Sequence, residues 1–347
     1  MNKKVSIIVV NWNGKYFLKK CLDSISRQKY QPYEVIVVDN ASTDGSISYI
    51  RKFFPKIKVI PNKSNIGCAK AYNLGFSKAK GDYIVNLNND TYSSDSLWLG
   101  KMVSDLEKDD AIAIVGSTHY TLKNLSYHKK HPNRVQTLNP LGYLVSHDYG
   151  KRVKDPFLVG GGALILKKKY FKYPLFPQEH YVSYGEDLAL CWKTRLNNLK
   201  IVMSNAVLIH DCCGSYSKNR KTAIFHYEKN KLMNLLLFYE SSSLIKLFPL
   251  MLMSSLIINT LHFKDIFIRF KSYCWLLFNY RIILQMRKKI QAKRKASDKD
   301  IFRFMSYKLV DEEDINNRLI RPITRIANKS VKVYYRLFNI KTLEFYP

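Results

Sequence analysis

A short polar cluster that follows an apolar run is the first place in this sequence where chemistry could occur. The run Tyr83–Leu87 lies between turn signals and is followed directly by Asn88, Asn89 and Asp90. β-Branched and aromatic residues between turn signals predict a strand, and ligands of open α/β sheets bind at the carboxyl ends of strands. A carboxylate flanked by amide oxygens suits a hard cation such as Mg²⁺ or Mn²⁺. The bland alternative is a turn that caps the next helix.

Two adjacent acids offer a candidate general base. Glu186 and Asp187 precede Leu188, Cys191 and Trp192, whose spacing is helical, so both acids are expected in the first turn of a helix. Acids are favourable there for helix-dipole reasons alone. A carboxylate at the edge of a cleft can also remove the proton of a hydroxyl nucleophile. The sequence leaves both interpretations open.

Three further polar residues, Asn11, Asp39 and His210, each come directly after a predicted strand. Asp39 could accept hydrogen bonds from a base N–H or a ribose hydroxyl, and it could equally cap the following helix. An imidazole at a strand end, such as His210, could complete a metal or diphosphate site. A lone histidine is more often simply hydrogen-bonded within the protein.

Alternating strands and helices must position these residues. The predicted strands are Val5–Val10, Glu34–Val38, Ile57–Ile60, Tyr83–Leu87, Ile112–Val115, Phe157–Leu166 and Ala206–Ile209. Apolar residues at helical spacing separate them, which predicts an α/β fold with a doubly wound, mostly parallel sheet. There is no G-x-G-x-x-G after the first strand and no G-x-x-x-x-G-K-[ST] anywhere in the chain. We therefore expect phosphates to be held by a metal and basic side chains.

Two regions near the middle of the chain give weaker signals. Ser117–Pro156 is polar and aromatic and is interpreted as an insertion facing an acceptor. Its histidines show no ligand-like spacing and are expected to be surface or loop residues: His119, His128, His131 and His147. The glycines at 160–162 interrupt the strand predicted at Phe157–Leu166, and glycine within a strand marks a bulge or a close approach to the backbone. A bound sugar or diphosphate and tight internal packing are the two explanations.

Composition narrows the class of protein. The chain has 347 residues and a formal net charge of +30, with 57 Lys and Arg against 27 Asp and Glu. Such a surplus indicates a polyanionic partner, such as nucleic acid, an anionic membrane or phosphorylated ligands. Six cysteines without a C-x-x-C pair argue against a zinc site or a disulfide framework and fit a reducing compartment. Val5–Val10 is too short for the apolar core of an export signal, so the catalytic part is expected in the cytosol.

The motifs, taken together in their order, resemble a known family. They are similar to the inverting, nucleotide-sugar-dependent glycosyltransferases of family 2, which have the GT-A fold, and to their rhamnosyltransferase-like branch. The similar segments cover roughly the first two-thirds of the chain and are Val5–Asn13, Val35–Ser46, Asn65–Asp90, the three glycines and Tyr184–Arg195.

The resemblance implies a role for each matching position. Asp39 would contact the nucleotide base, and Asp187 would be the acceptor's base, with Glu186 as the alternative. Asp90 and His210 would lie at a divalent metal, Mg²⁺ or Mn²⁺, beside the donor diphosphate. The donor contacts implied by the same resemblance are Asn11, Asn65, Gly67, Asn88, Asn89, Gly161 and Gly162. One departure is that the family's D-x-D motif here lacks its first acid.

The carboxyl-terminal third has a different composition. We predict a catalytic domain at 1–230, a basic, Leu-rich amphipathic helical region at 231–296 and a tail at 297–347 without an assigned role. The longest charge-free run, Leu247–Phe263, lies at the lower limit of the roughly 17–25 residues that span a bilayer. Apolar helices interrupted by Lys and Arg predict peripheral association with the anionic cytoplasmic face of the cell membrane. A cover for the catalytic domain or a homodimer interface is the alternative.

The sequence thus favours a glycosyltransferase acting on a nucleoside-diphosphate sugar and a lipid-linked or oligosaccharide acceptor in the synthesis of surface glycans. Net charge alone suggests a nucleic-acid-binding protein instead, but no nucleic-acid-binding motif is present. A processive membrane synthase would need several spanning segments and a Q-x-x-R-W motif, and the sequence has neither. A catalytically inactive scaffold is a further alternative, against which the intact pair Glu186-Asp187 argues.

Overall fold

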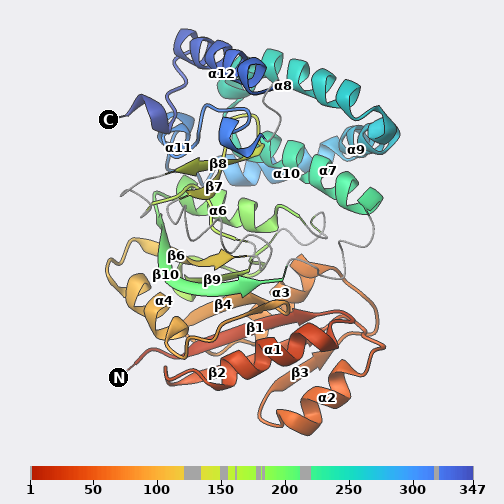
Figure 1. The fold of residues 1–347 in the computed structure, drawn as a ribbon, viewed down its shortest axis with the longest axis vertical. Helices are drawn as coiled ribbons and strands as arrows, with labels where there is room; N and C mark the ends of the chain where they lie inside the picture. The colour runs from red at the N-terminus through yellow and green to blue at the C-terminus, as the bar shows by residue number, and fades with distance from the viewer. Residues whose placement is uncertain are drawn as a thin grey trace. The chain divides into compact units, whose positions relative to one another are not determined.

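The computed structural model describes residues 2–120, 134–148, 155–160, 162–176, 181, 184–211, 220–315 and 320–346. The chain divides into two compact units. The first unit comprises Met1–Lys130, Val159–Thr194 and Leu199–Ala223, and the second comprises His131–Leu158, Arg195–Asn198 and Ile224–Pro347. The first unit carries the large sheet, and the second carries a small hairpin and most of the helices (Figure 1).

An eight-stranded sheet forms the framework of the first unit, with the strand order β3-β2-β1-β4-β9-β6-β10-β5. Its strands are β1 (Val5–Asn11), β2 (Tyr33–Asp39), β3 (Lys58–Pro61), β4 (Tyr83–Asn88), β5 (Thr91–Tyr92), β6 (Ile112–Tyr120), β9 (Ala163–Lys167) and β10 (Lys200–His210). β1 is parallel to β2 and β4, β2 to β3, and β6 to β10. β9 runs antiparallel to both β4 and β6, and β5 runs antiparallel to β10. The predicted α/β class is confirmed, with a mixed sheet.

Helices on both faces bury the apolar strands. They are α1 (Lys15–Ser26), α2 (Ser46–Phe53), α3 (Cys68–Lys78), α4 (Trp98–Glu107) and α6 (Glu186–Leu196). Side chains of α1 and α4, such as Leu22 and Trp98, share one core with alternate residues of β1, including Ile7. On the opposite face α3 lies very close to β1, because a Cβ added to Gly75 would stand 2.4 Å from Cγ2 of Ile8. The small residues of α3 permit this contact.

Two predictions about the middle of the chain are wrong. The strand expected at Phe157–Leu166 begins only at Ala163, since 157–160 have no strand partner. The polar stretch after residue 117 is not a single insertion, because β6 continues to Tyr120 and β7 (Arg134–Leu138) pairs with β8 (Leu144–Asp148) as an antiparallel hairpin. Buried apolar side chains, such as Leu138 and Val145, anchor the hairpin within an otherwise polar sequence.

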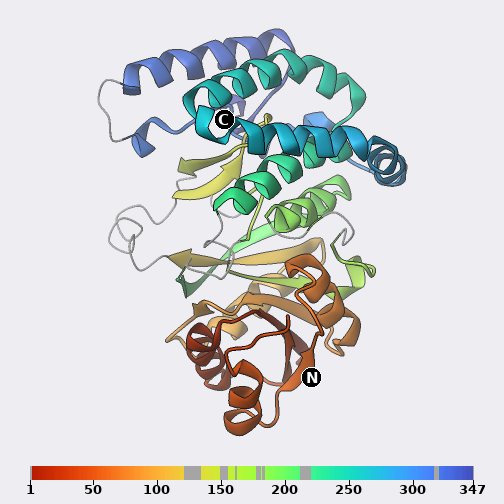
Figure 2. The ribbon, with the colours of Figure 1, turned by 90° about the vertical axis from the view of Figure 1, so that its right-hand side faces the viewer.

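The second unit is mainly helical. Its helices are α7 (Arg220–Phe238, which begins in the first unit), α8 (Ser241–Leu261), α9 (Ile266–Phe278), α10 (Tyr280–Gln291), α11 (Asp298–Phe302) and α12 (Ile320–Leu337). Tyr239, just after α7, is buried against Phe302, and its hydroxyl donates to the carbonyl of Pro140 over 3.1 Å. Gln291 of α10 donates to carbonyls at the carboxyl end of α7, which have no partner within that helix. The long apolar helix α8 runs beside α12 (Figures 1 and 2).

Candidate active site

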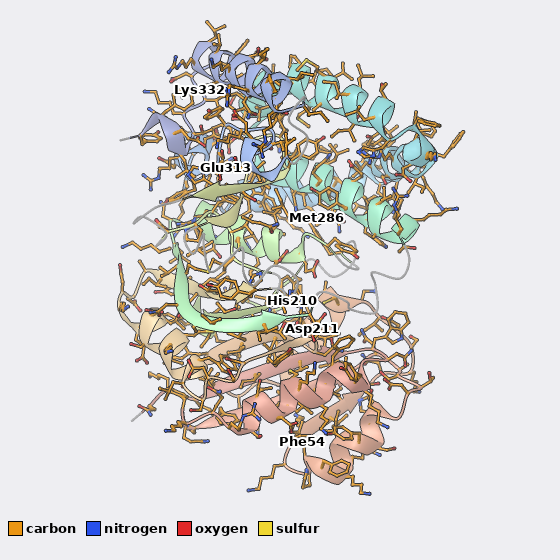
Figure 3. The ribbon with its side chains drawn as sticks, viewed as in Figure 1. Phe54, His210, Asp211, Met286, Glu313 and Lys332 are labelled. Atoms are coloured by element: carbon orange, nitrogen blue, oxygen red, sulfur yellow. The ribbon has the colours of Figure 1, made fainter. Side chains whose placement is uncertain are left out.

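Several predicted site residues end a strand. Asn11 is the last residue of β1, Asp39 of β2, Asn88 of β4 and His210 of β10. β1, β2 and β4 are neighbouring parallel strands, so their carboxyl ends share one edge of the sheet, and Asn11 is the register partner of Asp39. Figure 3 shows His210 with Asp211 at the end of β10. The candidate site therefore lies on the carboxyl-terminal edge, where the fold class predicts ligand binding.

A closed hydrogen-bond network holds the first part of this edge. The side chain of Asn11 is fully buried; its Nδ2 donates to Asp39 Oδ2 over 2.9 Å, and its Oδ1 accepts from Asn89 Nδ2 over 2.8 Å. The backbone N–H of Ser42 donates to Asp39 Oδ1 over 2.8 Å. Both carboxyl oxygens of Asp39 thus accept hydrogen bonds from the protein itself. The interpretation of Asp39 as a cap for the following helix is wrong, because α2 begins at Ser46 after Gly45 without a side-chain cap; its carboxylate instead holds the turn at Ser42.

Asn65 and Gly67 shape the turn into α3. The backbone N–H of Gly67 donates to Asn65 Oδ1 over 2.9 Å, and Gly67 has a φ of +83°, a conformation that glycine adopts readily. The carbonyl of Gly67 accepts from Asn40 Nδ2 over 3.3 Å. These two residues are therefore joined to the loop that follows Asp39.

Asp90 and His210 meet at the other part of the edge. Oδ1 of Asp90 lies 3.2 Å from Nε2 of His210, and Asn88 Nδ2 lies 3.5 Å from the same nitrogen. The short strand β5 fixes this approach, because Thr91 pairs with His210 across the ladder. Asp90 is buried, and apart from this contact with His210 its Oδ1 accepts no hydrogen bond from the described residues.

His119 is a site residue that the sequence did not identify. It lies on β6, and its ring stands edge-on to the ring of His210 with 5.9 Å between centroids. The expectation that it is a surface or loop residue is wrong, because β6 and β10 are neighbouring parallel strands. His147 lies on β8, also within a strand, whereas His128 and His131 fall outside the described residues. The spacing of the histidines along the chain cannot reveal that His119 and His210 lie on neighbouring strands.

The donor set fits a divalent cation that is held jointly with a ligand. Among the described residues no three His, Cys, Asp or Glu side chains are grouped as a metal site. One carboxylate from Asp90 and one imidazole from His210 supply part of a coordination shell, which phosphate oxygens and water can complete. Mn²⁺ accepts this mixture of oxygen and nitrogen ligands more readily than Mg²⁺ does.

The predicted acid pair begins α6, as the sequence indicated. Burial, together with the neighbouring charge of Asp187, raises the pKa of Glu186 to about 8. Oε2 of Glu186 is buried without a hydrogen bond from the described residues, and the thiol of Cys68 hydrogen-bonds to the same carboxyl group. At neutral pH Glu186 therefore holds its proton for most of the time.

The acid pair and Asp90 face one buried region. Burial raises the pKa of the Cys68 thiol well above its ordinary value, and the nearby carboxylates raise it further, Glu186 and Asp187 more than Asp90. One thiol at the start of α3 thus experiences all three charges. On the same helix the hydroxyl of Tyr72 donates to Asn88 Oδ1 over 2.9 Å. We call the cluster of Cys68, Tyr72, Asp90, Glu186 and Asp187 the acid pocket.

A glycine makes room for Asp187. A Cβ added to Gly160 would stand 2.1 Å from Asp187 Oδ2, so any larger residue would push this carboxylate from its position. The other oxygen, Oδ1, accepts from the backbone N–H of Leu188 over 2.8 Å. Gly162 lies against Thr91, and its carbonyl accepts from the N–H of Asn88. The sequence marked all the glycines at 160–162 as a bulge or a close approach, and the resemblance implied donor contacts at Gly161 and Gly162; Gly161 lies outside the described residues.

Solved structures define the class of fold. The mannosyltransferase PcManGT from Pyrobaculum calidifontis, in complex with GDP-Man and Mn²⁺, is 15% identical with a TM-score of 0.52, and the match covers 98% of this chain and 89% of that one. Residues 1–349 of S. aureus TarS, in complex with UDP-GlcNAc, match with a TM-score of 0.50 and 15% identity over 96% of this chain and 90% of that one. At this identity the likeness shows the fold alone, which is that of GT-A glycosyltransferases.

The sequence comparison agrees with the fold. Residues 6–173 match the family model described as Glycosyl transferase family 2, so this segment is similar to the domains of that family. An uncharacterized glycosyltransferase of Haemophilus influenzae is 35% identical over 116 residues, which are 33% of this chain and 36% of that protein. The chain spans 36 to 42% of the length of the first curated relatives that it matches.

Proposed function

We propose that this protein is an inverting glycosyltransferase of the rhamnosyltransferase-like kind. It transfers a sugar from a nucleoside-diphosphate sugar to a hydroxyl of a lipid-linked or oligosaccharide acceptor. The observation that carries the proposal is the acid pocket, where Glu186 Oε2 is buried without a hydrogen bond from the described residues and Asp90 Oδ1 is buried with only His210 Nε2 beside it, at 3.2 Å. Buried polar groups without partners are costly, so they are found where a ligand completes them. The similarity of residues 6–173 to the family 2 domains supports the same conclusion.

The two parts of the edge would bind the two ends of the donor. The loop held by Asn11 and Asp39 offers backbone and amide groups to the nucleoside, and Asp90 with His210 stands where the diphosphate would lie. A divalent cation bound there would supply positive charge to the leaving diphosphate. In this arrangement Asn89 links the two binding regions, because it donates to Asn11 on the nucleoside side and precedes Asp90 on the diphosphate side.

Asp187 is the acceptor's base in this proposal. Its carboxylate takes the proton of the acceptor hydroxyl, the acceptor oxygen forms a bond to the anomeric carbon, and the bond from that carbon to the diphosphate breaks. The nucleoside diphosphate leaves with the bonding electrons, and attack from the opposite face inverts the configuration. The raised pKa of Glu186, about 8, supports Asp187 over its neighbour, because a carboxyl group that already holds a proton cannot accept one.

The second unit would bring the enzyme to its acceptor. We propose that residues 231–296 associate with the anionic cytoplasmic face of the cell membrane. Phe248, Phe267 and Phe278 support this, since 61%, 84% and 87% of their surfaces are exposed. By length and composition α8 could cross a membrane, with 11% of its most apolar window buried, but one such helix does not establish a spanning segment.

A donor screen tests the proposed reaction. UDP-, dTDP- and GDP-sugars are added with and without Mn²⁺, and thermal stabilisation, hydrolysis and transfer are measured. We expect one nucleotide class to stabilise the protein, by about 2.7 kcal/mol at a hundredfold excess over its Kd. Absence of binding by every donor, together with retention of DNA or RNA on a filter, would replace this proposal with a nucleic-acid-binding function.

A further inference from the structure

Helix α12 carries three kinds of side chain on three separate faces. With about 100° between successive residues, Asn328, Val331 and Tyr335 share the face that is buried. A second face is apolar and exposed: Ile323 (66%), Ile326 (65%), Val333 (54%) and Leu337 (77%). A third face is basic: Arg321, Arg325, Lys329, Lys332 and Arg336. The helix contains no Asp or Glu.

The buried face fixes how the helix is turned. Both ends of the Asn328 amide are used, because its Oδ1 accepts from the N–H of Leu309 over 2.8 Å and its Nδ2 donates to the carbonyl of Val310 over 3.0 Å. Tyr335 is fully buried two turns further on. The exposed apolar face is therefore not a core face that has been turned outward.

A second apolar helix lies next to this face. The hydroxyl of Tyr334 donates to the carbonyl of Lys246 on α8 over 2.8 Å, and Figures 1 and 2 both show the two helices side by side. By helical angle Tyr334 lies between the apolar and the buried faces, so α8 and the basic residues border the apolar face on opposite sides. α8 itself exposes Ile245 (74%), Phe248 (61%), Leu252 (51%) and Leu256 (60%). Apolar surface of this extent on neighbouring helices marks an interaction site.

We infer that α12 docks on an anionic lipid bilayer, with its apolar face inserted between headgroups and its basic face against their phosphates. An apolar face beside a basic face is the arrangement of helices that lie in the membrane interface. Lys332, labelled in Figure 3, belongs to the basic face. The inference rests on the membrane localisation proposed above and extends the contact surface into 297–347, to which the sequence assigned no role.

Charge selects the bilayer over a second copy of the chain. Two copies that met through α12 would bring two basic faces together, and among the described residues only Arg325 of each face has a carboxylate partner, Glu312 at 3.1 Å. An anionic leaflet is complementary to both faces at once. We also expect α8 to lie in the plane of the membrane, because hydrogen bonds join it to its neighbours. The carbonyl of Lys246 on α8 accepts from α12, and Ser255 of α8 is hydrogen-bonded to Tyr273 of α9 over 3.0 Å.

The test is sedimentation of the full chain with vesicles. The vesicles are phosphatidylcholine with phosphatidylglycerol, and phosphatidylcholine alone, at low and high salt. We expect the wild type to bind the anionic vesicles, the double variant Ile323→Ser, Ile326→Ser to bind them at least about tenfold more weakly, and Lys329→Gln about fivefold more weakly at low salt. Phe53→Ser, which changes a residue of α2 with 57% exposure in the first unit, is the matched control and should bind like the wild type.

Each outcome decides between the proposals. Equal binding by the wild type and the double variant overturns the role of α12 and leaves membrane localisation through 231–296 intact. A wild type that ignores anionic vesicles at low salt overturns both. A wild type that is a dimer by light scattering, and that the double variant makes monomeric, assigns the apolar face to self-association instead. Circular dichroism and donor-induced stabilisation are measured on every variant, so loss of the fold or failure of the glycosyltransferase proposal is detected separately.

Discussion

The carboxylates in the two parts of the sheet edge differ in how many hydrogen bonds their oxygens accept. At the end of β2, both oxygens of Asp39 accept hydrogen bonds from Asn11 and from the backbone of Ser42. In the acid pocket, a buried oxygen of Glu186 accepts no hydrogen bond from the described residues, and the buried Oδ1 of Asp90 has only the ring of His210 beside it, at 3.2 Å. The first arrangement is complete without a ligand, and the second is not.

This difference separates positioning from chemistry. A buried carboxylate with all its hydrogen bonds stabilises one loop conformation, whereas a buried carboxylate without them raises the free energy of the folded state until a proton or a cation compensates it. The raised pKa of Glu186 is the direct sign of that cost. We therefore expect substitutions in the acid pocket to change catalysis, and substitutions in the network around Asp39 to change stability.

The largest effect is expected for Asp187→Asn. An amide cannot take the proton of the acceptor, so kcat should fall by about 10² to 10⁴ while donor binding is retained. Steady-state kinetics and donor calorimetry measure the two quantities. Asp110→Asn is the matched control, because that side chain is 76% exposed beside Lys169. Undiminished turnover by Asp187→Asn would remove the residue from the mechanism.

Gly160→Ala should give the next largest effect. The added methyl group would stand 2.1 Å from Asp187 Oδ2, so the carboxylate must move, and we expect kcat to fall by about 10- to 100-fold, since small misplacements of a catalytic group are costly. Gly100→Ala on α4 is the control, because its Cβ would lie 4.0 Å from the nearest atom. Equal activity of the two variants would show that the position of Asp187 is not critical.

Glu186→Gln should alter how stability depends on pH. The pKa of Glu186 in the folded protein, about 8, lies above the ordinary carboxyl value, so unfolding between these two values releases a proton. The stability contributed by this group is complete at pH values below the ordinary pKa and is lost as the pH rises through 8. We expect the wild type to lose about 2 kcal/mol between roughly pH 6 and pH 8 that the variant keeps.

Urea unfolding at a series of pH values measures that difference. Glu313→Gln, at an exposed position, is the control and should follow the wild type. Parallel curves for the wild type and Glu186→Gln would mean that Glu186 ionises in the folded protein much as it does in the unfolded chain. The contrast between the two parts of the edge would then lose its electrostatic basis.

The smallest effect on catalysis is expected for Asn11→Ala. The substitution removes a donor to buried Asp39 and an acceptor for Asn89, so the free energy of unfolding should fall by about 1 to 3 kcal/mol. Denaturant titration measures this fall, and Asn2→Ala, which loses one exposed hydrogen bond to a backbone carbonyl, is the control. A large loss of kcat without loss of stability would assign Asn11 to the chemistry instead.

Much of the edge could be predicted from local signals. The apolar run after Val5 is buried on both faces, and polar residues at its end and at the end of β2 marked the same side of the sheet. His119 could not be found in this way, because β9 is inserted antiparallel between β4 and β6, and the pairing of β6 with β10 then brings His119 to His210. The contact between Gly160 and Asp187 could not be predicted for a similar reason, since the sequence of the glycines does not reveal which side chain approaches them.

The sequence by itself determined the α/β class, the strand ends that carry Asn11, Asp39 and Asn88, and the position of the acid pair in the first turn of α6, because burial periodicity and turn residues act over a few neighbouring positions. Only the tertiary structure decided that Asp39 is fully hydrogen-bonded while Glu186 is not, and that α12 exposes an apolar face beside a basic one. Desolvation and hydrogen-bond satisfaction depend on atoms far apart in the chain, and the fold alone brings them together.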